Sequence, residues 1–170
     1  MSEVHQKIVD EIVKGYSKKP EVIAINVLGS LATGTERLDS DVDIEIVVDT
    51  DGEWGWEKRN KYGIHIDFVI CPKKQMEHQV RDYPFLSHIN LHKKILYDPQ
   101  NFMKGMQKEL QEYMDKHPEV VKFWEEKLKI MKENKAKGKD PHDAKKTFDE
   151  AEILFSKEHK ITRDYFRSDE

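Results

Sequence analysis

Residues 28–46 read L-G-S-L-A-T-G-T-E-R-L-D-S-D-V-D-I-E-I, a Gly-Ser turn followed after ten residues by two aspartates on either side of one valine. The segment 22–28 that leads into the turn is short, apolar and rich in β-branched residues, which is typical of a buried strand. In residues 41–48, apolar and acidic residues alternate, which predicts a strand with one apolar face and one acidic face.

A second alternating segment follows at residues 64–70, I-H-I-D-F-V-I. Asp41 and Asp43 are two residues apart on one strand, so their side chains point the same way with β-carbons about 6–7 Å apart. Asp67 occupies the same kind of face on the next alternating strand. We therefore expect the three carboxylates to converge on one point.

Three convergent carboxylates repel one another, and burying them without a partner costs several kcal/mol. A divalent cation removes that cost, and hard oxygen ligands suit Mg²⁺ or Mn²⁺. Two ions about 4 Å apart can be held when one aspartate bridges them. The pattern thus predicts a metal site of Asp41, Asp43 and Asp67 with two Mg²⁺ or Mn²⁺ ions.

The Gly-Ser turn predicts an anion site beside the carboxylates. A strand that runs into a tight turn and a helix N-terminus exposes backbone N–H groups that favour an anion. Gly29 allows close approach of the backbone, and Ser30 adds a hydroxyl donor and a candidate N-cap for a short helix over 31–36. The turn and the aspartates together are suited to a nucleotide triphosphate tail and its metal ions.

The rest of the chain indicates an α+β fold with the mixed part first. Helices are predicted over about 3–18 and 72–82, a strand over 94–97, and a loop over 50–61. From residue 99 the pattern is helical, with breaks at His117-Pro118 and at 138–141. We expect a nucleotide-handling domain over 1–98, with a small mixed sheet, helices on one side and the site on its open face, and a helical C-terminal region over 99–170.

Composition limits the partners and the compartment. The net charge of −4 comes from the first hundred residues, because residues 101–170 carry 16 basic and 16 acidic side chains. No basic cluster appears, so a long nucleic acid is not favoured as a partner. The chain has one cysteine, and no apolar run reaches the roughly 18 residues of a membrane span. We expect a cytoplasmic protein without a membrane-spanning segment.

Several polar and aromatic residues have both a structural and a functional interpretation. Glu45 and His65 lie on the acidic faces, where a salt bridge or solvent exposure is favoured over metal binding. The two tryptophans in the 50–61 segment could stack on a base or on the acceptor, or hold the loop on the sheet. The i, i+4 histidine pair lacks a third ligand for zinc, and a lysine pair before the last strand could reach the triphosphate. These residues are Trp54, Trp56, His88, His92, Lys93 and Lys94.

The stretch 28–46 followed by H-I-D-F-V-I resembles the DNA polymerase β-like nucleotidyltransferase superfamily over residues 22–98. Among its branches, the minimal nucleotidyltransferases and the kanamycin- and lincosamide-type antibiotic nucleotidyltransferases are most similar. The resemblance implies that Gly29 and Ser30 bind phosphates, that Asp41 and Asp43 are metal ligands, and that Asp67 binds the catalytic metal and helps to activate the acceptor hydroxyl. Many relatives carry an arginine where Thr33 stands, so that cationic contact is missing.

The resemblance implies an Mg²⁺-dependent enzyme that transfers a nucleoside monophosphate from an NTP, ATP being the favoured donor, and releases pyrophosphate. The acceptor would be a hydroxyl group of a small molecule or of a protein. A catalytically silent nucleotide-binding or antitoxin-like scaffold that acts through a protein partner remains the alternative. The three intact carboxylates favour the enzyme.

Overall fold

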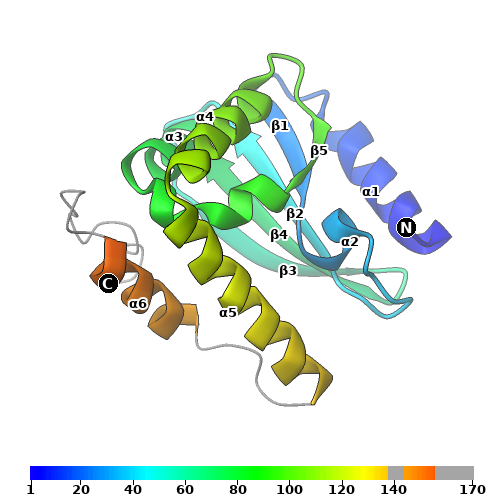
Figure 1. Cartoon of the computed structure of the whole chain (residues 1–170). Helices are drawn as coiled ribbons and strands as arrows, with labels where there is room; N and C mark the ends of the chain where they lie inside the picture. The colour runs from blue at the N-terminus through cyan, green and yellow to red at the C-terminus, as the bar shows by residue number, and fades with distance from the viewer. Residues whose placement is uncertain (138–143, 156–170) are drawn as a thin grey trace. The chain divides into compact units, whose positions relative to one another are not determined.

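The computed structural model describes residues 1–137 and 144–155, which contain helices and one five-stranded sheet (Figure 1). The elements in chain order are α1 Glu3–Tyr16, β1 Val22–Val27, α2 Gly29–Thr33, β2 Val42–Val48, β3 Gly55–Lys61, β4 Ile64–Pro72, α3 Lys73–Asp82, the 3₁₀ helices η1 Pro84–Leu86 and η2 His88–His92, β5 Lys94–Tyr97, α4 Phe102–Lys116, α5 Pro118–Ala136 and α6 Ala144–Phe155.

The sheet has the strand order β3-β4-β2-β1-β5 and is mixed. β2 and β4 run parallel at its centre, whereas the pairs β1–β2, β1–β5 and β3–β4 are antiparallel. β2 and β4 place their carboxyl ends at the same edge, and β3 completes a hairpin with β4. The predicted α+β fold with a small mixed sheet is confirmed.

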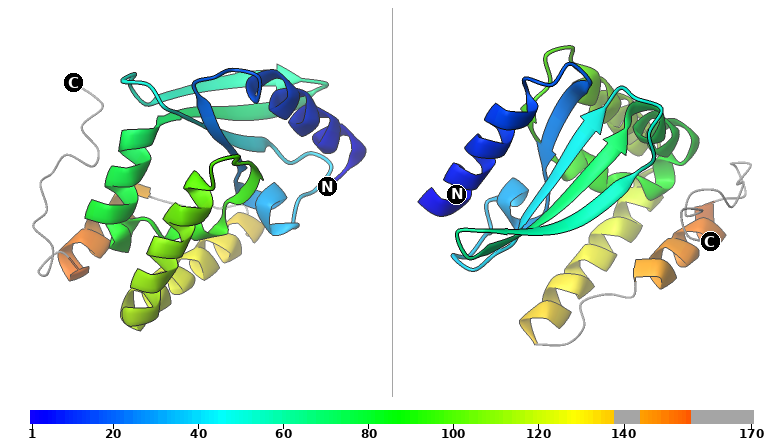
Figure 2. Two further views of the ribbon diagram at one scale, coloured as in Figure 1. Left: turned by 90° about the horizontal axis from the view of Figure 1, so that it is seen from above. Right: turned by 180° about the vertical axis from the view of Figure 1, so that it is seen from behind.

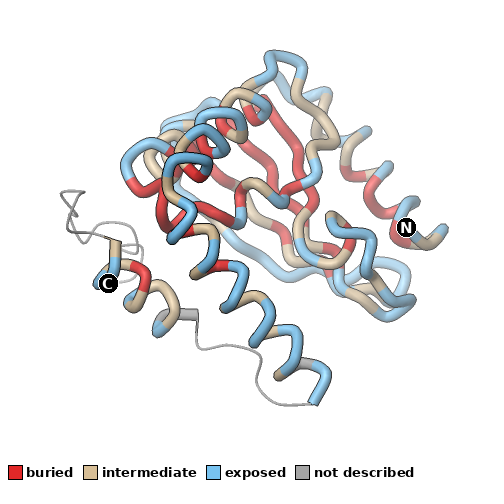
Figure 3. The backbone as a smooth tube through the Cα atoms, viewed as in Figure 1, coloured by how far each residue is buried: buried red, intermediate tan, exposed pale blue. Residues whose placement is uncertain are grey.

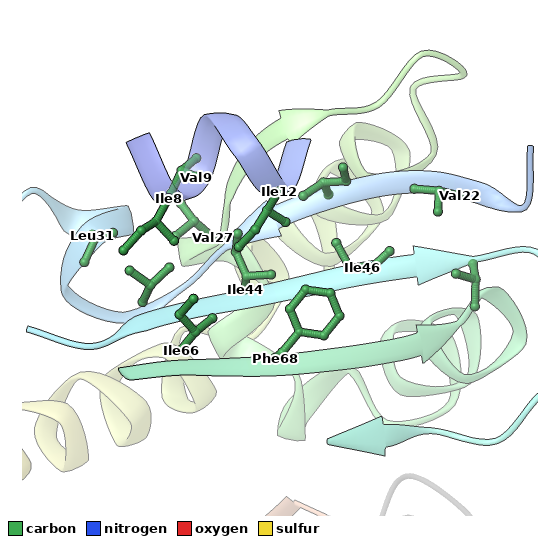
Figure 4. Close-up of a cluster of buried hydrophobic side chains, with 13 residues drawn as sticks. Ile8, Val9, Ile12, Val22, Val27, Leu31, Ile44, Ile46, Ile66 and Phe68 are labelled. Atoms are coloured by element: carbon green, nitrogen blue, oxygen red, sulfur yellow. The ribbon is translucent and has the colours of Figure 1, made fainter. Parts of the chain in front are cut away.

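One face of the sheet packs against α1 (Figure 4). Ile8, Val9 and Ile12 of α1 are buried among apolar side chains from the central strands, such as Ile44 and Phe68. The helix carries these residues at i, i+3, i+4 and i+7 spacing from residue 5, which makes one apolar stripe. Burial of such side chains contributes roughly 1.5–3 kcal/mol each, so this contact is a main source of the sheet's stability.

The strand over 55–61 was not predicted, because the segment 50–61 was expected to be a loop. Six of the seven residues of β3 are exposed, and its sequence G-W-E-K-R-N-K shows no apolar alternation. As the edge strand of the sheet, β3 hydrogen-bonds only to β4. Its formation depends on pairing with β4 and not on burial of an apolar face.

The helix after the Gly-Ser turn begins earlier than predicted. α2 spans Gly29–Thr33, with Leu28 as its N-cap, so Ser30 lies inside the first turn and is not the cap. The helix is one turn long and ends at Gly34, which has a left-handed φ of 68°. The predicted break at His117-Pro118 is confirmed, because α4 ends at Lys116 and α5 starts at Pro118. The break predicted at 138–141 lies outside the described residues.

The chain divides into two compact units. Unit 1 consists of residues 1–78 and 89–108 and contains the whole sheet, with α1 beside it in Figure 2. Unit 2 consists of residues 79–88 and 109–170. Within unit 2, the Trp124 indole N–H donates to the Phe85 carbonyl over 2.7 Å, and the Trp124 ring contacts Phe148 of α6. The predicted boundary near residue 98 stays a prediction.

Among the strands, the buried residues are concentrated in β1 and β2 (Figure 3). All six residues of β1 and six of the seven residues of β2 are buried. Among residues 1–137 and 144–155, no helix combines the length and the apolar character needed to cross a membrane.

Candidate active site

Asp43 and Asp67 are direct neighbours on the two parallel central strands. Their Cα atoms are register partners in the β2–β4 pairing, so their side chains share one face of the sheet. This face is opposite to the one that packs on α1, because Ile44 and Phe68, the next residues along, are buried against α1. Both aspartates are partly exposed. The strand register thus makes Asp43 and Asp67 neighbours, and the convergence of their carboxylates on one point stays a prediction.

Gly29 lies directly against the Asp43 carboxylate. Gly29 adopts a φ of 63°, and a β-carbon at this position would overlap Asp43 Oδ2. The turn is also tied to β2 through its backbone, because Leu28 N–H donates to the Asp43 carbonyl over 2.9 Å. Glycine is therefore required at position 29 for both its backbone conformation and the space it leaves, and the turn predicted to bind phosphate adjoins a predicted metal ligand.

Asp41 lies just before β2 and is exposed. The residue before it is held by α1, because His5 Nε2 and the Ser40 carbonyl are 2.8 Å apart. A carbonyl accepts only, so Nε2 donates to it, and the other ring nitrogen, Nδ1, lies 2.6 Å from the Ser2 hydroxyl oxygen. His5 is fully buried and thus anchors the loop that carries Asp41.

Sequence reasoning missed the role of His5, although a signal was present. Residues 5, 8, 9 and 12 share one stripe of α1, so a polar residue at position 5 had to be buried with the apolar ones. A buried imidazole needs hydrogen-bond partners. The identity of the partner, Ser40, could not be read from the sequence because it lies 35 positions away.

Glu45 forms a buried ion pair next to the aspartates and is not aimed at solvent. Its Oε2 lies 2.6 Å from the Lys93 ammonium, with 7% and 4% of the two side chains exposed. Its Oε1 accepts from the Asn26 amide over 3.0 Å. The interpretation of Glu45 as a salt-bridge residue is confirmed, and Lys93 is held by this carboxylate. Gln107 fixes the backbone around Lys93 by donating to the carbonyls of Asn90 and Lys93.

The sheet face that carries Asp43 and Asp67, here called the polar face, is buried on the β1–β2 side of unit 1 and exposed on the β3–β4 side. Asn26, Glu45 and Lys93 are buried at the β1–β2 end. At the β3–β4 end, Trp56 and His65 are exposed. Asp43 and Asp67 lie between these two regions and are partly exposed.

The chemistry of the donor set suits a hard cation, but the metal cluster is not preformed. No three His, Cys, Asp or Glu side chains within the described ranges 1–137 and 144–155 are arranged to hold a metal ion. Asp43 and Asp67 supply carboxylate oxygens from neighbouring register positions, and Asp41 precedes Asp43 by two residues. Oxygen ligands of this kind match Mg²⁺ or Mn²⁺.

The other candidates take up structural positions. His88 ends the unit 2 segment 79–88, where its ring stacks on Trp124 at 6.4 Å between centroids. His92 belongs to unit 1, and both histidines are in a 3₁₀ helix, so they lack the α-helical geometry of a zinc-binding pair. Lys94 is exposed at the start of β5.

Comparison with known proteins identifies a family for the part of the chain that contains the sheet. Residues 7–97, which include the sheet and all five candidate site residues, match the family described as "Nucleotidyltransferase domain". No curated protein matches the chain. Among solved structures, a nucleotidyltransferase-like protein from Exiguobacterium sibiricum is similar over 86% of this chain, with 11% identity and a TM-score of 0.49. The match spans 53% of that protein's length.

Proposed function

This chain belongs to the nucleotidyltransferase domain family, within the DNA polymerase β-like superfamily, and on that premise we propose that it transfers a nucleoside monophosphate from an NTP to a hydroxyl acceptor. The observation that carries the proposal is the placement of Gly29 against Asp43, with Asp67 as the register partner of Asp43. The Gly29–Ser30 turn, which we propose binds phosphate, thus lies beside two partly exposed carboxylates.

Each residue has a distinct task in this proposal. Gly29 and Ser30 would hold the triphosphate through the backbone N–H groups and the hydroxyl of the turn. Asp41, Asp43 and Asp67 would hold two Mg²⁺ or Mn²⁺ ions, with ATP the favoured donor. When bound, such ions supply charge neutralisation at the phosphates and at the leaving pyrophosphate.

In the reaction, the acceptor oxygen bonds to the α-phosphorus while the bond from that phosphorus to the pyrophosphate oxygen breaks. Asp67 would take the hydroxyl proton, because it lies on the β4 strand at the exposed side of the carboxylate pair. The Gly29–Ser30 turn would keep the triphosphate in line with the acceptor, which is a positioning effect worth several orders of magnitude in rate.

The direct experiment measures pyrophosphate release from ATP, GTP, CTP and UTP with Mg²⁺, Mn²⁺ or EDTA. We expect release to require the cation and to fall to background in Asp41→Asn and Asp43→Asn, whose folds should remain intact by circular dichroism. Asp39→Asn is the matched control. Asp39 is exposed, lies two positions before Asp41 and forms an ion pair with Arg37. Wild-type turnover in the Asp41→Asn/Asp43→Asn double variant would refute the site assignment.

The alternative function is a catalytically silent nucleotide-binding or antitoxin-like scaffold. The observation in its favour is that the described residues hold no preformed three-residue metal cluster. A scaffold would bind Mg²⁺·ATP, seen as thermal stabilisation, without releasing pyrophosphate in the presence of any acceptor. The same assay therefore separates the two functions.

A further inference from the structure

We propose that Trp56, Lys58, Asn60 and His65, on the exposed end of the sheet, form the acceptor subsite and bind a small molecule that carries a sugar ring and a phosphate group. This inference rests on the proposed nucleotidyl transfer and adds the chemical class of the acceptor to it. A sugar ring and a phosphate group occur together both in free sugar phosphates and in nucleotides. Binding of one probe from each class distinguishes these two sources.

Strand register brings these residues next to the third carboxylate. In the β3–β4 pairing, Lys58 is the partner of Asp67, Trp56 of Val69, and Asn60 of His65. Direct partners on antiparallel strands have β-carbons about 4.5–5.5 Å apart and point to the same face. A molecule lying on Trp56 and Lys58 would therefore place its hydroxyl group within reach of Asp67.

The alternate residues of β3 point to the other face and are engaged in holding the fold. The Arg59 guanidinium lies 4.0 Å from the centre of the Phe68 ring and donates to the Tyr16 hydroxyl. Lys61 forms an ion pair with Glu11 of α1. Glu57, the other side chain on this face, forms an ion pair with Arg59. On the Trp56–Lys58 face, these two side chains contact each other.

The exposure of Trp56 is the strongest sign of a ligand. This side chain is 52% exposed, although it is the largest residue of the strand and lies next to the candidate site. Tryptophan offers a flat apolar ring with one N–H donor, which suits stacking on a sugar ring or a base. Stacking of a base on an aromatic side chain contributes about 1–3 kcal/mol, enough to bind a small molecule weakly and in one orientation.

Lys58 supplies the charge that selects a phosphate. Its ammonium lies 5.3 Å from the centre of the Trp56 ring, and it has no carboxylate partner in the part of the chain that the structure describes. An ammonium group beside an aromatic platform can pair with the phosphate of a ring stacked there. Asn60 and His65, both exposed and directly paired, can hydrogen-bond the hydroxyl groups of the sugar.

An extended peptide added to the free edge of β3 is the competing occupant. The edge carries the run E-K-R-N-K, and charged side chains on an edge strand oppose pairing with a further strand. A stacked ring on the exposed face needs no backbone pairing and uses Trp56 directly. The exposed face therefore favours the small molecule.

The experiment follows the indole N–H signals of the full chain by ¹H–¹⁵N NMR, without NTP or divalent cation. The three tryptophans, Trp54, Trp56 and Trp124, give three signals, assigned with Trp54→Phe and Trp56→Phe. Glucose 6-phosphate, AMP and glucose are the probes, titrated at about 150 mM salt. We expect glucose 6-phosphate or AMP to shift the Trp56 signal, to leave Trp124 unchanged, and to bind at least about tenfold more tightly than glucose.

The matched variants are Lys58→Met and Lys61→Met, on opposite faces of the same strand. Lys58→Met should weaken the binding of the phosphate probe at least about fivefold, and Lys61→Met should change it less than about twofold. A tighter response to glucose 6-phosphate identifies a free sugar phosphate as the source, and a tighter response to AMP identifies a nucleotide.

The inference is overturned if neither phosphate probe shifts Trp56, if glucose binds as well as glucose 6-phosphate, or if the two lysine variants weaken binding equally. It is also overturned if only a peptide with β-strand propensity shifts the β3 backbone signals. Pyrophosphate release by the wild-type chain, and its dependence on Asp43, are measured separately. A failure of the phosphate probes to bind would overturn the subsite but not the proposed nucleotidyl transfer. An absence of pyrophosphate release would overturn the transfer but not the binding result.

Discussion

Gly29 and Asp43 occupy complementary space, because Asp43 Oδ2 lies where a side chain at position 29 would begin. The close approach brings the turn after β1 against the start of β2. The first prediction is that Gly29→Ala displaces the Asp43 carboxylate and lowers NTP turnover on the order of 10²-fold, the size of effect expected for a misplacement of about 1 Å. Pyrophosphate release measured beside urea unfolding checks this.

Gly63→Ala is the matched control for the backbone effect. Gly63 has a φ of 78°, comparable to that of Gly29, but a β-carbon there would meet nothing within 4 Å. Both variants should lose about 1–2 kcal/mol of unfolding free energy from the left-handed conformation. Only the Gly29 variant should lose turnover, and equal losses of turnover in both would contradict the steric argument.

The second prediction separates the role of Asp67 from that of Asp43. Asp67 lies on β4 at the side of the exposed face and should act on the acceptor more than on the nucleotide. Asp67→Asn should keep Mg²⁺·ATP binding within about tenfold but lower the rate at least about 10²-fold, the low end for removal of an acid–base group. Titration calorimetry and single-turnover kinetics give the two numbers. Losses of equal size in binding and rate would remove the distinction.

The strands that carry the aspartates could be predicted because their apolar residues alternate. In β2, Val42, Ile44 and Ile46 face α1, and this spacing by itself places Asp43 on the opposite face. The same alternation in β4 places Asp67. Local sequence was sufficient here because one face of each strand is buried.

The rest of the site depends on partners distant in sequence. β3 has no apolar pattern, so Trp56 was expected in a loop and its place beside the β4 carboxylate could not be inferred. Lys93 and Glu45 are 48 positions apart, and only the fold shows that they pair. The overlap of Gly29 with Asp43 likewise depends on the packing of the turn on β2, which no sequence spacing determines.

The third prediction concerns Cys71, the chain's single cysteine. Burial, followed by the nearby Glu45 carboxylate, raises the pKa of the Cys71 thiol from 9.0 to about 12. At pH 8 the thiolate fraction should be about a thousandfold lower in the folded chain than in urea. The rate of reaction with a disulfide reagent such as DTNB should fall at least that far, and comparable rates in both states would contradict it.

The raised pKa of Cys71 also determines how the unfolding free energy changes with pH. The unfolded chain releases the Cys71 proton near pH 9 and the folded chain near 12, so the unfolded state binds fewer protons between these values. The stabilisation is fully present below about pH 9 and is lost as the pH rises toward 12. Cys71→Val should therefore show a shallower loss of unfolding free energy above pH 9 than the wild type, measured by urea unfolding.

The fourth prediction tests the buried pair beside the site. Removing one partner of a buried ion pair leaves an uncompensated charge and typically costs 3–5 kcal/mol. Lys93→Met should lower the unfolding free energy by about that amount, because the Glu45 carboxylate would keep only the Asn26 amide as a partner. Urea unfolding followed by circular dichroism is the measurement.

The neighbouring lysine and the double variant decide whether the pair itself is responsible. Lys94 is exposed, so Lys94→Met should change the unfolding free energy by less than about 0.5 kcal/mol. Adding Glu45→Gln to Lys93→Met should restore more than about half of the loss, because an amide replaces the unpaired carboxylate. If Lys93→Met costs no more than Lys94→Met, the ion pair does not stabilise the polar face, and the burial of Glu45 must then be compensated through Asn26 alone.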